Sequence, residues 1–169
     1  SRPQLEKFES LYHKKGAVIS AVDLIKGIAI CAGMKSIDVP GANGNYDTNY
    51  DGKANAAISA LRDGYDFVYV HLEGPDECGH QGNAAHKKLA VERIDEKIIA
   101  PIRAAMKEDG EHYKMLVLPD HPTPVALKTH VSDSIPYLIY DSEKPIQTNL
   151  TYTEKNAEKT GIFVPLGHE

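Results

Sequence analysis

Short apolar segments alternate with longer amphipathic segments along this chain, and that alternation limits the folds it can adopt. Five apolar segments have the length and composition of strands, namely residues 17–21, 36–39, 66–72, 113–118 and 135–140. Segments with a helical spacing of apolar residues lie between them, at residues 22–34, 53–61 and 83–107. Strands that alternate with helices form layers around a mostly parallel sheet. The sequence therefore predicts an α/β fold in which a mostly parallel sheet is flanked by helices.

Local signals add detail to this prediction. Residues 66–72 (DFVYVHL) are almost continuously apolar, as in a strand that is covered on both faces. Asp51 is the expected cap of the helix at 53–61, Pro101 is expected to kink the long helix, and residues 73–80 are expected to form a tight loop. Short helices are also predicted at residues 5–12, within a lead-in segment 1–15, and at residues 151–159.

Composition and charge exclude several classes of protein. With 169 residues, of which 41% are hydrophobic, the chain is expected to form a single domain, residues 1–169. A net charge of −5 argues against a nucleic-acid-binding surface. No apolar run reaches the roughly 18 residues of a membrane span, and residues 1–4 start no signal peptide. Two cysteines give no disulfide framework, so we expect a cytoplasmic protein.

Side chains that can bind metal follow two of the predicted strands. Asp76 and His80 come soon after the strand at 66–72, and the pair Asp120-His121 follows the strand at 113–118. His130 lies in the loop before the strand at 135–140. Open α/β sheets bind ligands at the carboxyl ends of their strands, so these five side chains can converge on one edge. Carboxylate and imidazole together suit Mn²⁺, Zn²⁺ or Fe better than Ca²⁺.

A plainer interpretation of the same residues stands beside this one. A histidine near the end of a strand is more often a hydrogen-bonding loop residue than a metal ligand, and Asp before His is common by chance. Cys78 is more simply a small residue in a tight loop than a ligand, and His71 is a core residue or a neighbour of the site. The pattern alone leaves metal binding and a purely structural role equally open.

The order of several longer phrases resembles one enzyme family. They are SAVDLIKGIAICAGM, VPGANGNYDTNYDGKANAAI, VHLEGPDECGHQGN, ERIDEKI, VLPDHPTP and THVSDSIPYLIY. Together they cover nearly the whole chain, and they resemble the archaeal-type cofactor-independent (2,3-bisphosphoglycerate-independent) phosphoglycerate mutases of the alkaline phosphatase superfamily. The resemblance implies interconversion of 3-phosphoglycerate and 2-phosphoglycerate through a phosphoserine intermediate.

The resemblance also implies a two-metal site. Asp76, His80 and His130 match the ligands of a first metal, and Asp120 and His121 match part of a second. The implied cofactors are two divalent ions, most simply Mn²⁺ with Zn²⁺ or Mg²⁺ as alternatives, and no 2,3-bisphosphoglycerate. Lys26 is a candidate contact for substrate phosphate, although a solvated helix lysine is an equally good interpretation.

This sequence departs from the family pattern in what it lacks. The family's N-terminal strand, which carries an Asp ligand and the nucleophilic Ser, has no counterpart here, and neither has the inserted domain. We therefore expect an alkaline phosphatase-like core without those two parts, the C-terminal portion of a longer enzyme. No catalytic nucleophile is assigned in this chain, which is expected to be inactive alone and to self-associate through exposed strand edges.

Two other functions compete with the mutase interpretation. The chain resembles other members of the superfamily in its metal-ligand pattern, so a phosphatase, phosphodiesterase or phosphopentomutase is the nearest alternative. A non-catalytic metal-binding domain is the second. The expected partner of the full-length enzyme is phosphoglycerate, with neither nucleic acid nor membrane.

Overall fold

A three-stranded parallel sheet forms the centre of the computed structural model, which describes residues 3–167. Strand β1 (Gly16–Ile19) lies between β2 (Lys35–Ile37) and β3 (Phe67–Val70), and all four of its residues are buried. The predicted parallel α/β arrangement is therefore confirmed. The ends of the expected domain, residues 1–2 and 168–169, lie outside the described part of the chain.

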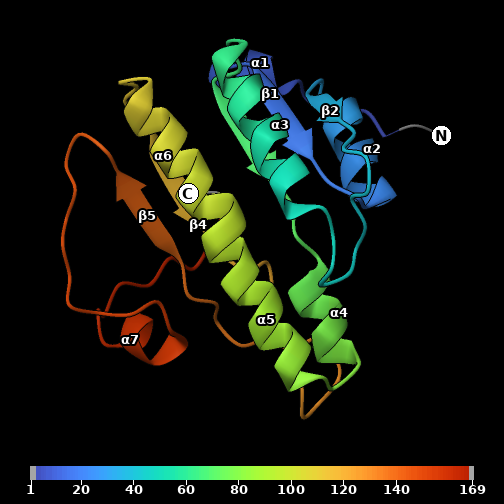
Figure 1. The fold of residues 1–169 in the computed structure, drawn as a ribbon, viewed down its shortest axis with the longest axis vertical. Helices are drawn as coiled ribbons and strands as arrows, with labels where there is room; N and C mark the ends of the chain where they lie inside the picture. The colour runs from blue at the N-terminus through green and yellow to red at the C-terminus, as the bar shows by residue number, and fades with distance from the viewer. Residues whose placement is uncertain (1–2, 168–169) are drawn as a thin grey trace.

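Helices cover this sheet and build the core with it (Figure 1). Helix α2 (Asp23–Cys31) connects β1 to β2, and α3 (Tyr50–Arg62) connects β2 to β3. Ala54 and Ala57 of α3 are almost completely buried, and their small side chains let α3 approach its neighbours closely. In the core they pack with Ile19 from the sheet and with Ile98 and Ile102 from the long helical segment at residues 84–108.

The long helix predicted at 83–107 is present but is not regular throughout. It consists of α5 (Ala84–Ile94), a π-helical turn η1 (Asp95–Ile99) and α6 (Ala100–Glu108). Pro101 lies in the first turn of α6 and has no N–H to donate to the preceding turn. A widened π-helical turn lets the helix continue past such a residue, and Figure 1 shows the helix running on from α5 to α6.

Two further strands pair separately from the first three. Strands β4 (Lys114–Val117) and β5 (Leu138–Asp141) form an antiparallel pair, so β5 runs against the parallel direction that was expected. A return in the parallel direction needs a crossover, usually a helix, and residues 118–137 contain none. Within residues 3–167, β3 and β4 belong to different sheets, although Val68 and Met115 pack on the same core.

The expectation that the strand at 66–72 is covered on both faces is wrong. Alternate residues of β3 are exposed, with Phe67 at 41% and Tyr69 at 40%. Strand β3 lies at the edge of its sheet, and α3 covers the face that carries Val68 and Val70. The apolar strand β3 therefore lies at the edge of the sheet with one face exposed to solvent.

Several local predictions also need correction. The cap of α3 is Asn49, whose Oδ1 accepts a hydrogen bond from the N–H of Gly52, and not Asp51. The expected loop at 73–80 is largely a helix, α4 (Gly74–His80), because Pro75 at its start suits a first turn. The first and last predicted helices are shorter than expected, as α1 (Phe8–Tyr12) and α7 (Glu154–Glu158). Among the described residues, no helix is long and apolar enough to cross a bilayer.

Candidate metal centre

Helix α4 places two of the predicted ligands on one face. Asp76 and His80 are four residues apart, which brings them together on consecutive turns of a helix. Gly79 lies between them at a point of close approach, because a Cβ there would collide with the carbonyl oxygen of Thr123. The helix is therefore packed directly against the segment that follows β4.

His130 joins this pair from a distant part of the chain. Its Nε2 lies 3.3 Å from Oδ1 of Asp76 and 3.0 Å from Nε2 of His80. Nε2 of His80 lies 3.4 Å from Oδ2 of Asp76. The three side chains that the sequence assigned to a first metal thus meet in one place.

Hydrogen bonding determines which nitrogen of His80 is free. Its Nδ1 lies 3.1 Å from the carbonyl oxygen of Lys128, which can only accept, so Nδ1 carries the hydrogen. In the neutral ring, the lone pair of Nε2 then faces the carboxylate of Asp76 and Nε2 of His130. Donor atoms about 2.1 Å from one cation, at angles between octahedral and tetrahedral, lie about 3.0–3.4 Å apart. The observed separations fall in that range, with His80 and His130 facing different oxygens of Asp76, so this group fits a divalent cation that Asp76 would bind through one or both oxygens.

The second predicted pair lies against the first. Nε2 of His121 is 3.2 Å from Oδ2 of Asp120, and the backbone N–H of His121 donates to Oδ1 of Asp120. The ring centroids of His121 and His130 are 3.8 Å apart. One ligand atom each from Asp76, His121 and His130 can be chosen so that all three lie within 4.8 Å of one another. His121 therefore lies close to ligands of both predicted metal sites, which the sequence analysis treated as separate. Asp120 is largely exposed to solvent.

The surroundings of the cluster are strongly acidic. Burial raises the pKa of Glu73, and the nearby carboxylates of Glu77, Asp76 and Asp120 raise it further. Several carboxylates in one place repel one another and would repel an anionic substrate. Divalent cations relieve that repulsion, which is a second reason why these residues fit a metal centre.

One buried charge near the cluster was missed at the sequence level. Lys53 of α3 is only 1% exposed, and its Nζ donates to the carbonyl oxygen of His71, just beyond β3. Burial lowers the pKa of Lys53 to about 8. A signal was present, because Lys53 shares the apolar face of α3 with Tyr50, Ala54 and Ala57. A lysine on such a face indicates either a snorkelling side chain or a buried ammonium.

A serine and a histidine lie beside each other at the ends of β1 and β3. Oγ of Ser20 is 3.2 Å from Nδ1 of His71. Ser20 is 3% exposed, and its Oγ also accepts the backbone N–H of Val22, which holds the turn into α2. Burial lowers the pKa of His71, and the charge of Lys53 lowers it further. These contacts support a structural role for Ser20.

Lys26, the candidate phosphate contact, is engaged elsewhere. Its Nζ forms an ion pair of 2.7 Å with Oδ1 of Asp38, just beyond β2. The hydrogen bond to Asp38 raises the pKa of Lys26. The structure therefore places Lys26 at the carboxyl end of the sheet, but paired with a carboxylate and not in contact with the histidine cluster.

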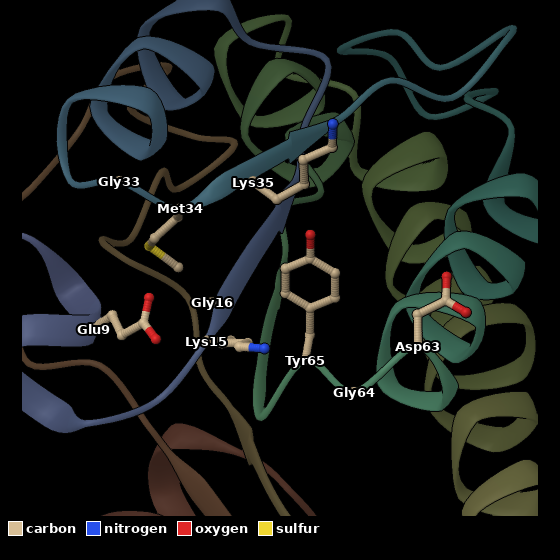
Figure 2. Close-up of a pocket in the computed structure, with 9 residues that line it drawn as sticks. All are labelled: Glu9, Lys15, Gly16, Gly33, Met34, Lys35, Asp63, Gly64 and Tyr65. Carbon is tan, nitrogen blue, oxygen red and sulfur yellow. The ribbon is translucent and has the colours of Figure 1, made fainter.

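A surface pocket lies at the opposite end of the sheet from the cluster. Gly16 begins β1 and Lys35 begins β2, and both line this pocket. Figure 2 shows Lys15 and Lys35 in it together with the carboxylates of Glu9 and Asp63. Charges of both signs give it no preference for an anion, and the candidate metal ligands do not line it. The candidate metal ligands therefore lie beyond the carboxyl ends of the strands, and not in this pocket.

The fold and the cluster together define a class, α/β proteins that gather imidazole and carboxylate donors beyond the carboxyl ends of strands. The chain belongs to the metalloenzyme superfamily, whose sequence model matches residues 1–164. A solved structure of a protein from Pyrococcus horikoshii is similar, with a TM-score of 0.84 and 31% identity over 94% of this chain and 47% of that one. A Leishmania mexicana phosphoglycerate mutase, 16% identical with a TM-score of 0.58, shares the fold over 85% of this chain and 33% of its own.

A curated relative is more similar in sequence. The 2,3-bisphosphoglycerate-independent phosphoglycerate mutase of Methanosarcina mazei is 50% identical over 159 residues, which are 94% of this chain. Those residues are 40% of that enzyme, so the chain spans less than half of the relative that it matches.

Proposed function

We propose that this chain is the metal-binding, C-terminal portion of a cofactor-independent phosphoglycerate mutase. Convergence of Asp76, His80 and His130, with His121 beside them, is the observation that carries the proposal. The name of the Methanosarcina mazei relative supports the choice of reaction and the independence from 2,3-bisphosphoglycerate. We expect a cytoplasmic enzyme, in agreement with the free thiols of Cys31 and Cys78.

The residues of this chain would divide their roles between two divalent cations, for which we propose Mn²⁺. Asp76, His80 and His130 would hold one cation, and Asp120 and His121 would contribute to the other. When bound, such cations supply the positive charge that binds phosphoryl oxygens and stabilises charge in the transition state. Lys26 would contact the substrate after exchanging Asp38 for a phosphate group.

The remaining parts of the reaction would come from polypeptide outside these 169 residues. The nucleophilic Ser, the further Asp ligand and the inserted domain that the resemblance implies have no counterpart here. The acidic surroundings of the cluster would hold a phosphorylated substrate only with cations bound, which ties substrate binding to metal binding.

A chimeric enzyme tests this proposal. The amino-terminal portion of the Methanosarcina mazei mutase would be joined to residues 1–169 in place of its own matching segment. With Mn²⁺ and without 2,3-bisphosphoglycerate, the chimera should convert 3-phosphoglycerate to 2-phosphoglycerate, and the 169-residue chain alone should not. Replacing His80 by Ala in the chimera should abolish turnover.

The opposite results are equally clear. A folded, Mn²⁺-binding chimera that hydrolyses p-nitrophenyl phosphate but does not isomerise phosphoglycerate would assign the chain to a phosphatase and not to a mutase. Unchanged Mn²⁺ binding after His80→Ala would refute the assignment of the ligands.

A further inference from the structure

The hydroxyl of Thr123 lies between the two groups of candidate ligands. Its Oγ1 donates a hydrogen bond to Oδ1 of Asp76 and lies 3.3 Å from Nδ1 of His121. Thr123 is 3% exposed, so water does not compete for these contacts. One buried hydroxyl thus touches a ligand on α4 and a ligand on the segment after β4.

Counting hydrogens assigns the form of the His121 ring. A hydroxyl has one hydrogen, and an ionised carboxylate can only accept, so the Thr123 hydrogen goes to Asp76. The contact with His121 is then a hydrogen bond only if Nδ1 of His121 carries a hydrogen and donates it. Nε2 of His121 then faces Oδ2 of Asp120 at 3.2 Å. With no hydrogen between them these two atoms would repel each other, so a cation bound by both would complete the arrangement.

The backbone around Thr123 is fixed from several sides. Its carbonyl oxygen accepts a hydrogen bond of 2.6 Å from Nζ of Lys87, and it packs closely on Gly79 of α4. The N–H of Val131 donates to the carbonyl of Pro122, which ties the segment carrying His130 to the same turn. The hydroxyl is therefore held in place, and it does not follow the ring of His121.

We propose that Thr123 is a positioning residue that couples the two ligand groups, holding His121 in the form whose Nε2 is free to bind metal while it orients the carboxylate of Asp76. This inference rests on the proposed role of Asp76 and His121 as ligands. Neither the family match nor the two-metal assignment gives Thr123 a role. Outer hydrogen-bond partners of this kind change metal affinity by about 10- to 100-fold when they are removed.

Substitutions at Thr123 separate positioning from packing. Thr123→Val keeps the shape of the side chain and removes the hydroxyl, and Thr123→Ser keeps the hydroxyl. Thr48→Val is the matched control, because Thr48 is also buried, at 5% exposed, and its hydroxyl accepts a hydrogen bond from the N–H of Asn43.

Two measurements on the 169-residue chain provide the test. Calorimetric titration with Mn²⁺ should give a dissociation constant about 10- to 100-fold higher for Thr123→Val than for the wild type, with Thr123→Ser close to the wild type. Nitrogen NMR of the chain loaded with Zn²⁺, in which Nε2 of His121 would bind the cation, should show its Nδ1–H protected from exchange with solvent in the wild type and exchanging faster in Thr123→Val. Thr48→Val should change neither.

The outcomes distinguish this inference from the proposed function. Wild-type affinity and an unchanged His121 ring in Thr123→Val would overturn the inference while leaving the metal centre intact. If the wild-type chain bound neither Mn²⁺ nor Zn²⁺, the proposed function would fail, and the inference, which rests on it, would fail with it.

Discussion

Replacing Lys53 by methionine should remove a rise in stability with pH, so that the variant is more stable than the wild type at neutral pH and less stable at high pH. Lys53 is a buried ammonium whose Nζ donates to one backbone carbonyl, that of His71. Methionine has a similar length and no charge, so Lys53→Met removes the cost of burying the ammonium together with that hydrogen bond. The two effects have opposite signs and different pH dependences, which makes them separable.

The size of the effect follows from the pKa. Burial lowers the pKa of Lys53 from 10.5 to about 8 in the folded state. Between these pH values the unfolded chain binds a proton that the folded chain does not, so the wild-type free energy of unfolding rises with pH. The full change is about 3 kcal/mol, because one pKa unit corresponds to about 1.4 kcal/mol. The lost hydrogen bond costs the variant about 1 kcal/mol at every pH.

Lys53→Met should therefore be more stable than the wild type by about 2 kcal/mol at pH 7, nearly equal to it near pH 10, and less stable at higher pH, by up to about 1 kcal/mol. Urea unfolding followed by circular dichroism, in metal-free buffers from about pH 7 to 10.5, measures this difference. Tyrosine ionisation affects both proteins and largely cancels. Lys88→Met, which removes an exposed lysine of α5, is the control and should give a flat difference. A flat difference for Lys53→Met as well would refute the reasoning.

Other predictions concern the metal, the packing of α4 and the free strand edges. His80→Ala should lower Mn²⁺ affinity at least about 10-fold by calorimetry, whereas His112→Ala, at an exposed site, should not change it. Gly79→Ala should destabilise the fold by about 1–3 kcal/mol in urea unfolding, because its Cβ meets a backbone oxygen. Gly27→Ala, in open space on α2, should stabilise by about 0.5–1 kcal/mol, and the opposite order would contradict the packing described. The chain should self-associate in light scattering as its concentration rises, and Leu116→Lys on β4 should reduce this; a wild-type monomer at all concentrations would count against exposed edges.

Much of the fold was predictable because its signals are local. The strands around Val18 and Met115, and the helices between the strands, follow from apolar periodicity and chain order. The gathering of Asp76, His80 and His130 was also expected, from the premise that strand ends share one edge of a sheet, although β3 and β4 belong to different sheets in the structure. That expectation needed only the order of elements and not their detailed packing.

The errors arose where long-range packing decides the outcome. The direction of β5 depends on its pairing with β4, and the exposure of Tyr69 depends on which strand lies next to β3. The burial of Lys53 depends on how closely α3 approaches the sheet, because a lysine at that position could equally extend to solvent. The helix at α4 was missed because Pro75 was interpreted as the end of a strand and not as the start of a helix.

The two sheets share no backbone hydrogen bond within residues 3–167, and the candidate ligands lie on both sides of that gap. Asp76 and His80 follow β3, whereas His121 follows β4. A cation bound by both sets would add a link between two sheets that are otherwise joined through the shared core and through the contacts of Thr123 with α4. Removal of the cation by a chelator would then loosen the contact between the two sheets, so metal content would help to determine how rigid this chain is.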